Sequence, residues 1–539
     1  MSHSVAPTTT RLHLVGAGPQ FLPAAPPISS HRIVDAANVA LKSPIVLTTD
    51  DALPSLRHAA RTIANTNRLR ILAVGASVTA GCGSAEPPFD TRCAYSHNKS
   101  AIPMSRQCTL TGGWVRRLHD ALPDALRQSG WHSPPRISTS VHAKNAVGAG
   151  FFARCTSHWM PHGVDIVLLD LAQVLAGLEA DFSRLVDAIR RTAPRAAIVF
   201  IAWRQQGPAG AIAKIKHHAT ALGVDVLRID LLMRELVTGW AKTRPTASLG
   251  QRDCRPSRDM LYAQHGLDKV HPSPEGHALM ATIAARFLAT RLLAANASVP
   301  KRGREVAPFA SKSAPPSRWE QCFLRADKML PLVQSASNRG WRLVDEGSSA
   351  KGVQKLGLLS QSIGDVLRLG PVGPGARVRC DSKLKATYRS TRFMMEVGYK
   401  LSPNPDNGAF TLGCEGACSC HRLASSSKSS SSMAKQLGPF PSVDTNARIN
   451  PYARFREPDF DATISFSTVF FLDVPAEDAK RGECVLTITH APAGTGLSAA
   501  ARANYLLHRG AAPNASVVRI DSLSAWCDEA ASKEFEIHR

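Results

Sequence analysis

The stretch ILAVGASVTAGCG, residues 71 to 83, decides the fold of the first half of this 539-residue chain. An apolar run ends at Gly75, and Ser77 follows where a buried strand would turn into a helix. Strands of this composition are typical of parallel sheets covered on both faces. A serine at such a turn projects from the carboxyl end of the sheet, as a nucleophile would, although an N-capping serine gives the same pattern.

The pattern of strand and helix repeats as far as residue 297. Short apolar runs alternate with amphipathic stretches, which predicts an α/β domain with a parallel sheet and crossover helices. We expect strands at 70–75, 136–143, 164–171, 196–203 and 224–229, and helices at 112–128, 178–194, 209–223 and 275–296.

Composition divides the rest of the chain. Residues 1–64 are expected to form an N-terminal tail that is partly disordered, before an α/β domain over 65–297. The polar, basic and proline-rich run 298–318 predicts a linker. Over 319–539, short β-branched and aromatic runs between Gly and Pro turns predict an all-β sandwich, interrupted by a Ser-rich loop at 423–435.

A second motif, LDKVHPSPEGHALMA, occupies residues 267 to 281, and in it Asp268 precedes His271 by three residues. A D-x-x-H unit can direct a carboxylate at one imidazole nitrogen while the other nitrogen faces a serine hydroxyl. The alternative is a surface Asp and His in a loop that enters a helix.

Together the two segments resemble the SGNH hydrolase (GDSL-like esterase) family over about residues 68–297. GASVTAG resembles its first block, GDSxTxG, and DKVHPSPEGH resembles its last, DxxHPxxxGH. The resemblance implies a three-layer, flavodoxin-like parallel-sheet fold in which Ser77 is the nucleophile, His271 the general base and Asp268 its orienting partner. His277 is then left without a catalytic role, and we expect a core or capping histidine there.

The resemblance also implies an oxyanion hole made by the N–H of the serine, a glycine N–H and an asparagine side chain. AKNAVGAG (143–150) resembles the second block, with Gly150 the candidate donor and Gly148 the alternate. The third-block asparagine is absent: Val174 stands at its position and Gln173 one residue before. Gln173 would serve as the donor if the loop shifts by one residue.

The expected function is that of a serine esterase that needs no cofactor and no metal. An O-acetyl or other short acyl ester, preferably on a carbohydrate, is the expected substrate, because a β-sandwich beside an esterase is often a glycan-binding module. Transfer of the acyl group to a sugar hydroxyl is the alternative reaction. The missing asparagine keeps open a catalytically impaired glycan-binding protein, whereas Ala76 in place of the family aspartate is a mild departure.

Charge and hydropathy bear on the partners. The formal net charge is +23, but Lys and Arg are spread along the chain and no nucleic-acid recognition motif accompanies them. We expect a basic solvated surface and no nucleic-acid partner. A specific polyanion site, for which an acidic polysaccharide is the first choice, is the alternative. The sequence has no run of 18 apolar residues, so it predicts no membrane-spanning helix. It makes no prediction of the oligomeric state.

Twelve cysteines favour disulfides and with them a secreted or endomembrane location. The N-terminus nevertheless lacks a secretory apolar region, and an organellar transit peptide also fits its composition. The cysteines cluster in loop-like sequence at Cys82, Cys93 and Cys108 and at Cys414, Cys418 and Cys420. The second cluster would need a fourth ligand to hold zinc and has only His421 at hand, so we predict disulfides there.

Overall fold

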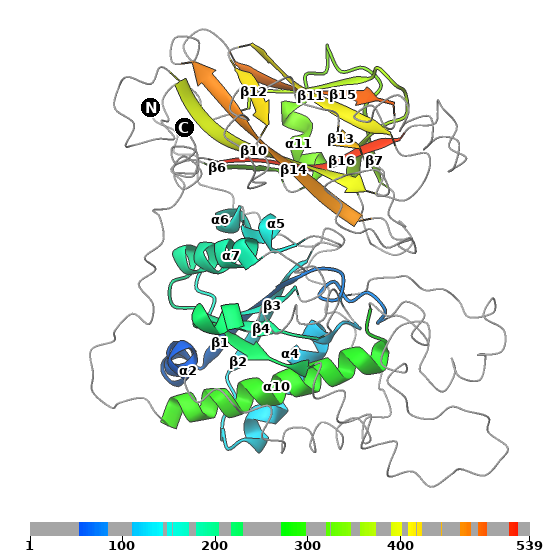
Figure 1. Cartoon of the computed structure of the whole chain (residues 1–539). Coiled ribbons are helices and arrows are strands. Elements are labelled where there is room, and N and C mark those ends of the chain that lie inside the picture. The colour runs from blue at the N-terminus through cyan, green and yellow to red at the C-terminus, as the bar shows by residue number, and fades with distance from the viewer. Residues whose placement is uncertain are drawn as a thin grey trace, which may run out of the picture. The chain divides into compact units, whose positions relative to one another are not determined.

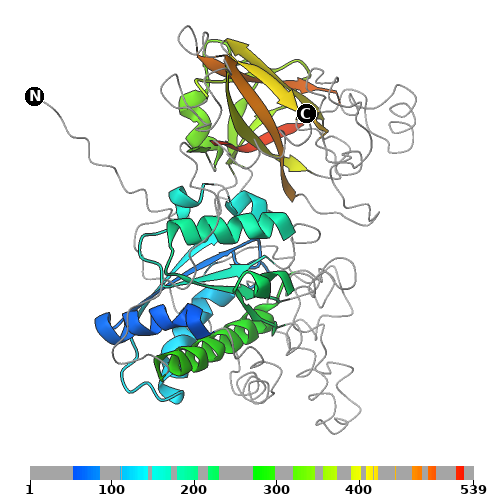
Figure 2. The same cartoon turned by 60° about the vertical axis from the view of Figure 1, so that its left-hand side comes forward.

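The computed structural model (Figures 1 and 2) divides into two compact units, Met1–Lys312 and Ser313–Arg539. It describes residues 53–84, 110, 112–143, 148–153, 155–171, 179–203, 217–229, 271–297, 320–323, 325–345, 356–372, 390–401, 408–416, 418–422, 443–444, 464–475, 483–492 and 517–526. The predicted linker, the Ser-rich loop and most of the helix expected at 209–223 lie outside these residues and stay predictions.

A five-stranded parallel sheet is the centre of the first unit, with the strand order β2-β1-β3-β4-β5. Its strands are β1 Arg68–Gly75, β2 Arg136–Ala143, β3 Ile166–Asp170, β4 Ala197–Ile201 and β5 Asp225–Leu227. Every residue of β3 and β4 is buried, which is expected of strands covered on both faces. The order is that of the flavodoxin-like sheets. The predicted α/β class and all five predicted strands are confirmed.

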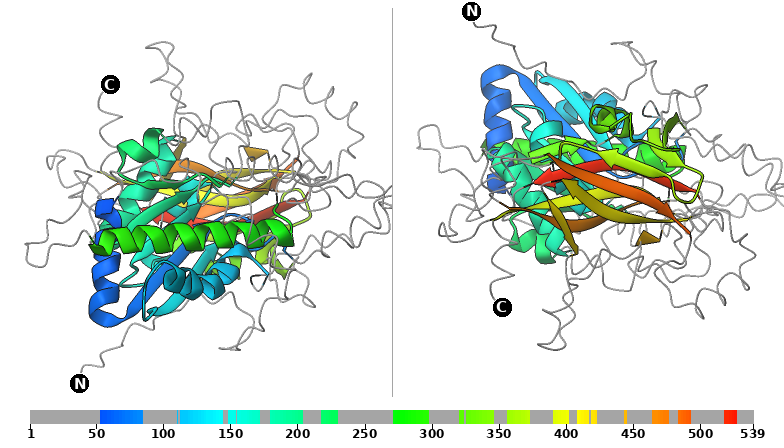
Figure 3. Two further views of the ribbon diagram at one scale, coloured as in Figure 1. Left: turned by 90° about the horizontal axis from the view of Figure 1, so that it is seen from below. Right: turned by 90° about the horizontal axis from the view of Figure 1, so that it is seen from above.

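Helices cover both faces of this sheet (Figures 1 and 3). One face carries α2 Leu53–Thr66, α4 Trp114–Gln128 and α10 Pro274–Ala297; the other carries α5 Ala149–Ala153, α6 Thr156–Trp159 and α7 Glu179–Thr192. The larger apolar core lies between the sheet and the first group, where Trp114, Leu118 and Leu122 of α4 are fully buried. The arrangement is therefore three-layered.

Helix α2 corrects the predicted domain boundary. Residues 1–64 were assigned to a tail, yet α2 begins at Leu53 and packs Leu56, Ala59 and Ile63 into the core. The tail prediction underestimated this segment because its apolar residues, at helical spacing, are interrupted by Arg and His. The α/β unit therefore begins at least twelve residues before the predicted boundary of 65.

Helix α10 is the single helix in the described part of the chain that is long and apolar enough to cross a membrane. It packs against α2 and α4, and 67% of its most apolar window is buried inside the protein. Its apolar surface is thereby explained by the core of the α/β unit.

The second unit contains two antiparallel sheets. The larger has the order β12-β14-β10-β16-β8-β7, with β6 also paired to β16; the smaller has the order β13-β11-β15-β9. Their strands are β6 Glu320–Phe323, β7 Arg342–Asp345, β8 Leu356–Ser360, β9 Val366–Leu369, β10 Ser390–Leu401, β11 Ala409–Gly416, β12 Ser419–Arg422, β13 Val443–Asp444, β14 Ile464–Pro475, β15 Cys484–Ala491 and β16 Val518–Trp526. A short helix, α11 Ala326–Met329, and a 3-10 turn, Leu330–Leu332, precede β7.

The two sheets share one apolar core, in which Tyr399 of β10 meets Phe410 of β11 with ring centroids 5.3 Å apart. Polar groups also join the sheets, because the hydroxyl of Ser360 lies 2.6 Å from Nδ1 of His490. Apart from α11 and the 3-10 turn, the regular elements described in this half are antiparallel strands, as predicted. Its assignment to the sandwich class stays a prediction.

Disulfides close the cysteine cluster of this unit. Cys414 is bonded to Cys420, and Cys418 is bonded to Cys484, 66 residues further on. No cysteine among the described residues is free. The predicted disulfides are present, and Cys484 is the partner that the sequence analysis did not find, because β15 meets the cluster only through the pairing of β11 with β15.

Candidate active site

Ser77 lies in a tight turn directly after β1. The backbone N–H of Ala80 donates to the carbonyl of Ala76 at 3.1 Å, and that of Cys82 donates to the carbonyl of Ser77 at 2.9 Å. Gly75 ends the strand because nothing larger fits: a Cβ there would lie 2.5 Å from the backbone oxygen of Asp170 and closer still to Oγ1 of Thr79. The strand must therefore end in glycine for the serine turn to close against β3.

The turn sits where the strand order of the sheet reverses. Gly75 pairs with Ala143 of β2 on one side and with Asp170 of β3 on the other. After β1 the chain continues to α4 on one face of the sheet, and after β3 it continues to α7 on the other face. In open α/β sheets such a divergence opens a crevice outside the carboxyl ends of the two strands. Ser77 is thus at the position in the fold where ligands ordinarily bind.

His271 reaches Ser77 from the far end of the unit's sequence. Its Nε2 lies 2.8 Å from Oγ of Ser77, a normal hydrogen-bond distance, and both residues are partly exposed. Because 194 residues separate them, the fold and not local sequence makes this contact. The structure therefore brings together two of the predicted site residues.

The start of α10 holds His271 in place. Oγ of Ser273 accepts the backbone N–H of Gly276 at 3.1 Å, the bond of an N-cap, and Pro274 follows at the first helical position. On the serine side, Gly83 has φ +89°, and a Cβ there would overlap the carbonyl oxygen of Pro272. The chain after Ser77 and the chain after His271 therefore lie backbone against backbone.

The structure describes only some of the remaining predicted site residues. Asp268 and Gln173 lie outside the described residues. Gly150 is buried in α5, and the carbonyl of Gly148 accepts the N–H of Phe151 at 3.2 Å. The segment that carries both glycines leaves the sheet at Ala143, next to Gly75.

His277 is a buried capping histidine, as predicted. Nδ1 accepts the backbone N–H of Trp114, the first residue of α4, at 3.1 Å, so Nε2 carries the proton and donates to the carbonyl of Cys82 at 2.9 Å. Burial lowers its pKa to about 3. The ring is therefore neutral and joins α10 to α4 and to the serine turn.

Asp170 is the site residue that sequence reasoning missed. It ends β3 and is 2% exposed. Its Oδ2 accepts hydrogen bonds from Oγ1 of Thr79 at 2.8 Å and from Nε1 of Trp114 at 3.2 Å. Oδ1 is buried and has no hydrogen-bond partner among the described residues. Burial raises the pKa of this carboxyl to about 6. An acid inside the apolar run VDIVLLDL was the signal that could have found it.

Comparison with known proteins gives structural similarity of low degree. No protein-family model matches the chain, and no curated protein matches it. A protein assigned to the lipolytic G-D-S-L family, from Desulfitobacterium hafniense DCB-2, is 13% identical over 40% of this chain and 98% of its own, with a TM-score of 0.23. An extracellular lipase from Streptomyces rimosus is 13% identical over 40% of this chain and 97% of its own, with a TM-score of 0.19.

A tail fibre protein from an E. coli phage is 12% identical, with a TM-score of 0.28. It matches 81% of this chain, which spans about half of that protein (48%). Similarities of this degree do not define a function, whereas the geometry of Ser77 and His271 indicates one.

Proposed function

We propose that this protein is a serine esterase in which Ser77 is the nucleophile and His271 the general base. The observation that carries the proposal is the 2.8 Å hydrogen bond between Oγ of Ser77 and Nε2 of His271, at the topological switch point of the sheet. A serine hydroxyl is a weak nucleophile until a neighbouring base takes its proton. Imidazole is the side chain that most often serves as a general base, and the ring of His271 is partly exposed.

The reaction proceeds in two halves. Oγ of Ser77 attacks the acyl carbon while its proton passes to Nε2 of His271, and the protonated imidazole then gives that proton to the leaving alcohol. A water molecule, activated by the same imidazole, releases the acyl group from Ser77. Asp268, three residues before His271, is proposed to accept a hydrogen bond from the Nδ1–H of His271 and so to hold the ring in the correct tautomer.

The oxyanion of the tetrahedral intermediate needs donors beside Ser77. We assign this role to the N–H groups of Ser77 and Gly150 and to the side chain of Gln173. The register supports the assignment, because the segments that carry these groups follow β1, β2 and β3, whose ends are direct neighbours at Gly75, Ala143 and Asp170. A short acyl ester, such as an O-acetyl group on a carbohydrate, is the proposed substrate.

The test uses the full chain and two probes of the serine. Ser77→Ala is expected to abolish hydrolysis of a short-chain aryl ester and labelling by a fluorophosphonate, with a thermal midpoint within about 1 °C of wild type, because the partly exposed hydroxyl contributes little packing. Ser138→Ala, on the exposed start of β2, is the matched control and should retain both.

Wild-type protein that labels but does not hydrolyse would redirect the proposal towards acyl transfer to a sugar. Wild-type protein that neither labels nor hydrolyses would point to a glycan-binding protein. Activity retained in Ser77→Ala would remove Ser77 from the site.

A further inference from the structure

Three arginines lie at the amino ends of β1 and β2, opposite the carboxyl end of the sheet that carries Ser77. Arg68 and Arg70 alternate with buried Leu69, so their side chains leave β1 on the same face. Arg136 of β2 is the register partner of Arg68. Since parallel strands lie about 4.8 Å apart, two guanidinium groups start from adjacent backbone positions. Like charges placed this closely cost stability unless an anion accompanies them.

A pocket of about 260 Å³ opens at this edge, lined by Thr62 and Thr66 of α2 and by Arg68 and Arg70 of β1. This volume lies a little below the range of pockets that hold drug-sized ligands, about 300–1,000 Å³, and so suits a group the size of one sugar ring.

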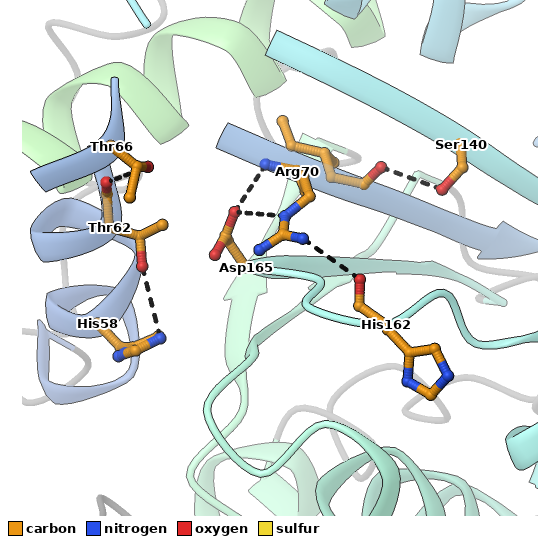
Figure 4. Close-up of polar contacts among 8 residues, drawn as sticks. His58, Thr62, Thr66, Arg70, Ser140, His162 and Asp165 are labelled. Atoms are coloured by element: carbon orange, nitrogen blue, oxygen red, sulfur yellow. Dashed lines mark hydrogen bonds and ion pairs between the residues drawn. The ribbon is translucent and has the colours of Figure 1, made fainter. Parts of the chain in front are cut away.

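Arg70 is held in a fixed orientation (Figure 4). Its Nε lies 3.7 Å from Oδ2 of the buried Asp165, and its Nη1 donates to the carbonyl of His162 at 3.4 Å. Gly163, with φ +71°, lies so close that an added Cβ would overlap the guanidinium. Asp165 is 3% exposed and takes one edge of Arg70, whose side chain is 49% exposed. Arg70 is thus a fixed, half-exposed cation in the wall of the pocket, with Nε and Nη1 already engaged.

Arg68 and Arg136 are both exposed. Within the described part of the chain, neither side chain has a hydrogen bond or an ion pair. Among the described residues Asp165 is paired with Arg70, so Arg68 and Arg136 have their full donor capacity available. Guanidinium groups bind sulfate, phosphate and carboxylate oxygens in bidentate fashion.

Thr66 adds an acceptor to these donors. Oγ1 of Thr66 donates to the carbonyl of Thr62 at 2.7 Å, which leaves the lone pairs of the Thr66 hydroxyl available. A site with both guanidinium donors and a hydroxyl acceptor matches a ligand that carries both an oxyanion and hydroxyl groups. A sulfated or uronic sugar has both, whereas an inorganic anion at neutral pH has little to donate.

We propose that Arg68, Arg70 and Arg136, with Thr62 and Thr66, form a subsite for an anionic sugar residue of an acidic polysaccharide. The eight residues of β1 separate this subsite from the Ser77 turn, by roughly 25 Å at about 3.3 Å per residue. The subsite therefore anchors the polymer away from the reacting ester. This proposal does not depend on Ser77 being a nucleophile.

The test measures equilibrium binding of a sulfated heparin-derived tetrasaccharide to the full chain at 50 and 150 mM salt. Arg68→Gln/Arg136→Gln is expected to weaken binding at least tenfold. Arg116→Gln/Arg127→Gln is the matched control: it removes the same charge from the surface of α4, where each arginine already pairs with an acid, and should change affinity less than twofold. An equal loss in the control would reduce the effect to net charge and overturn the subsite.

A second variant tests the geometry without changing the charge. Gly163→Ala keeps every charge but takes the space of the Arg70 guanidinium, so it should also weaken binding several-fold, with folding checked by the thermal midpoint. Inorganic sulfate and the desulfated tetrasaccharide are the comparison ligands. If inorganic sulfate bound as tightly as the sulfated tetrasaccharide, the site would hold a free oxyanion and the sugar assignment would be wrong. Repeating the binding in Ser77→Ala, where affinity should be unchanged, separates this result from the esterase proposal.

Discussion

At the residue scale, His277 and Asp170 are two buried ionisable groups with opposite pKa shifts behind the serine turn. Both contact Trp114, His277 through the backbone N–H and Asp170 through the indole N–H. Burial favours the neutral form of each side chain, and it is the first cause of both shifts. The serine turn is therefore held by neutral, hydrogen-bonded groups at mildly acidic pH and by one buried charge, on Asp170, at neutral pH.

The signs of the two contributions to stability follow from these shifts. The pKa of His277 is lowered from 6.5 to about 3, so its contribution is complete above pH 6.5 and is lost as the pH falls towards 3. The pKa of Asp170 is raised from 3.8 to about 6, so its contribution is complete below pH 3.8 and is lost as the pH rises to 6. Each slope is about 1.4 kcal/mol per pH unit.

Between pH 4 and 6 the two slopes oppose each other, which predicts the behaviour of single variants. Asp170→Asn should lose stability relative to wild type as the pH falls from 6 to 4, and His277→Gln should gain it. The free energy of unfolding is measured in denaturant at pH 4, 5, 6 and 7. Amide hydrogen exchange of peptides from β1 and α4, at the same pH values, is the second measurement. A difference from wild type that stays constant over this range would show that the pKa values are not shifted.

At the scale of elements, the end of β1 is the tightest part of the candidate site. Gly75→Ala is predicted to destabilise the α/β unit by about 1–3 kcal/mol, the usual cost of overpacking, and to abolish ester hydrolysis, because the new Cβ meets both Thr79 and the backbone of Asp170. Adding Thr79→Ala should not restore activity, since the Asp170 carbonyl cannot move without breaking β3.

Gly130→Ala is the control for this prediction. Unlike Gly75, Gly130 has a positive φ, +103°, so alanine there costs strain of roughly 1 kcal/mol, but the nearest atom to its Cβ is 3.9 Å away. The esterase activity of the Gly130→Ala variant should equal that of wild type. Full activity in Gly75→Ala would mean that the turn does not need to close against β3.

The disulfides of the second unit differ in the loops that they close. Cys418–Cys484 spans 66 residues and Cys414–Cys420 spans 6, so loop entropy predicts losses of about 4 and about 2 kcal/mol, respectively, when each pair is replaced by alanine. The thermal midpoint of this unit is the measurement. Ester hydrolysis in the first unit should be unaffected by both changes, and an equal loss from the two pairs would contradict the entropic account.

At the scale of the whole molecule, the chain has two cores with separate sets of residues, one around the parallel sheet and one between the antiparallel sheets. Limited proteolysis is predicted to cut within 298–318 and to leave two resistant fragments. The fragment that carries Ser77 and His271 should keep its fluorophosphonate labelling. A single fragment that resists cleavage within 298–318 would contradict the predicted linker.

The sequence by itself determined the parallel sheet and the order of its strands, and two motifs named Ser77 and His271 as candidates. These features are local: apolar runs such as 164–171 and motifs such as HPSPEGH are legible because burial and capping act over neighbouring residues. The contact between Ser77 and His271, across 194 residues, is made by the fold. Only the tertiary structure decided that α2 belongs to the unit, that Cys418 pairs with Cys484, and that Asp170 supports the serine turn.

The contacts that only the tertiary structure decided join groups far apart in the chain. Thr79 and Asp170 are 91 residues apart, and Arg70 and Asp165 are 95. No periodicity in the sequence encodes such pairs, because they exist only once the strand order β2-β1-β3 has placed the ends of three strands side by side. The same order puts the serine crevice at the carboxyl ends of the strands and the arginine pocket at their amino ends.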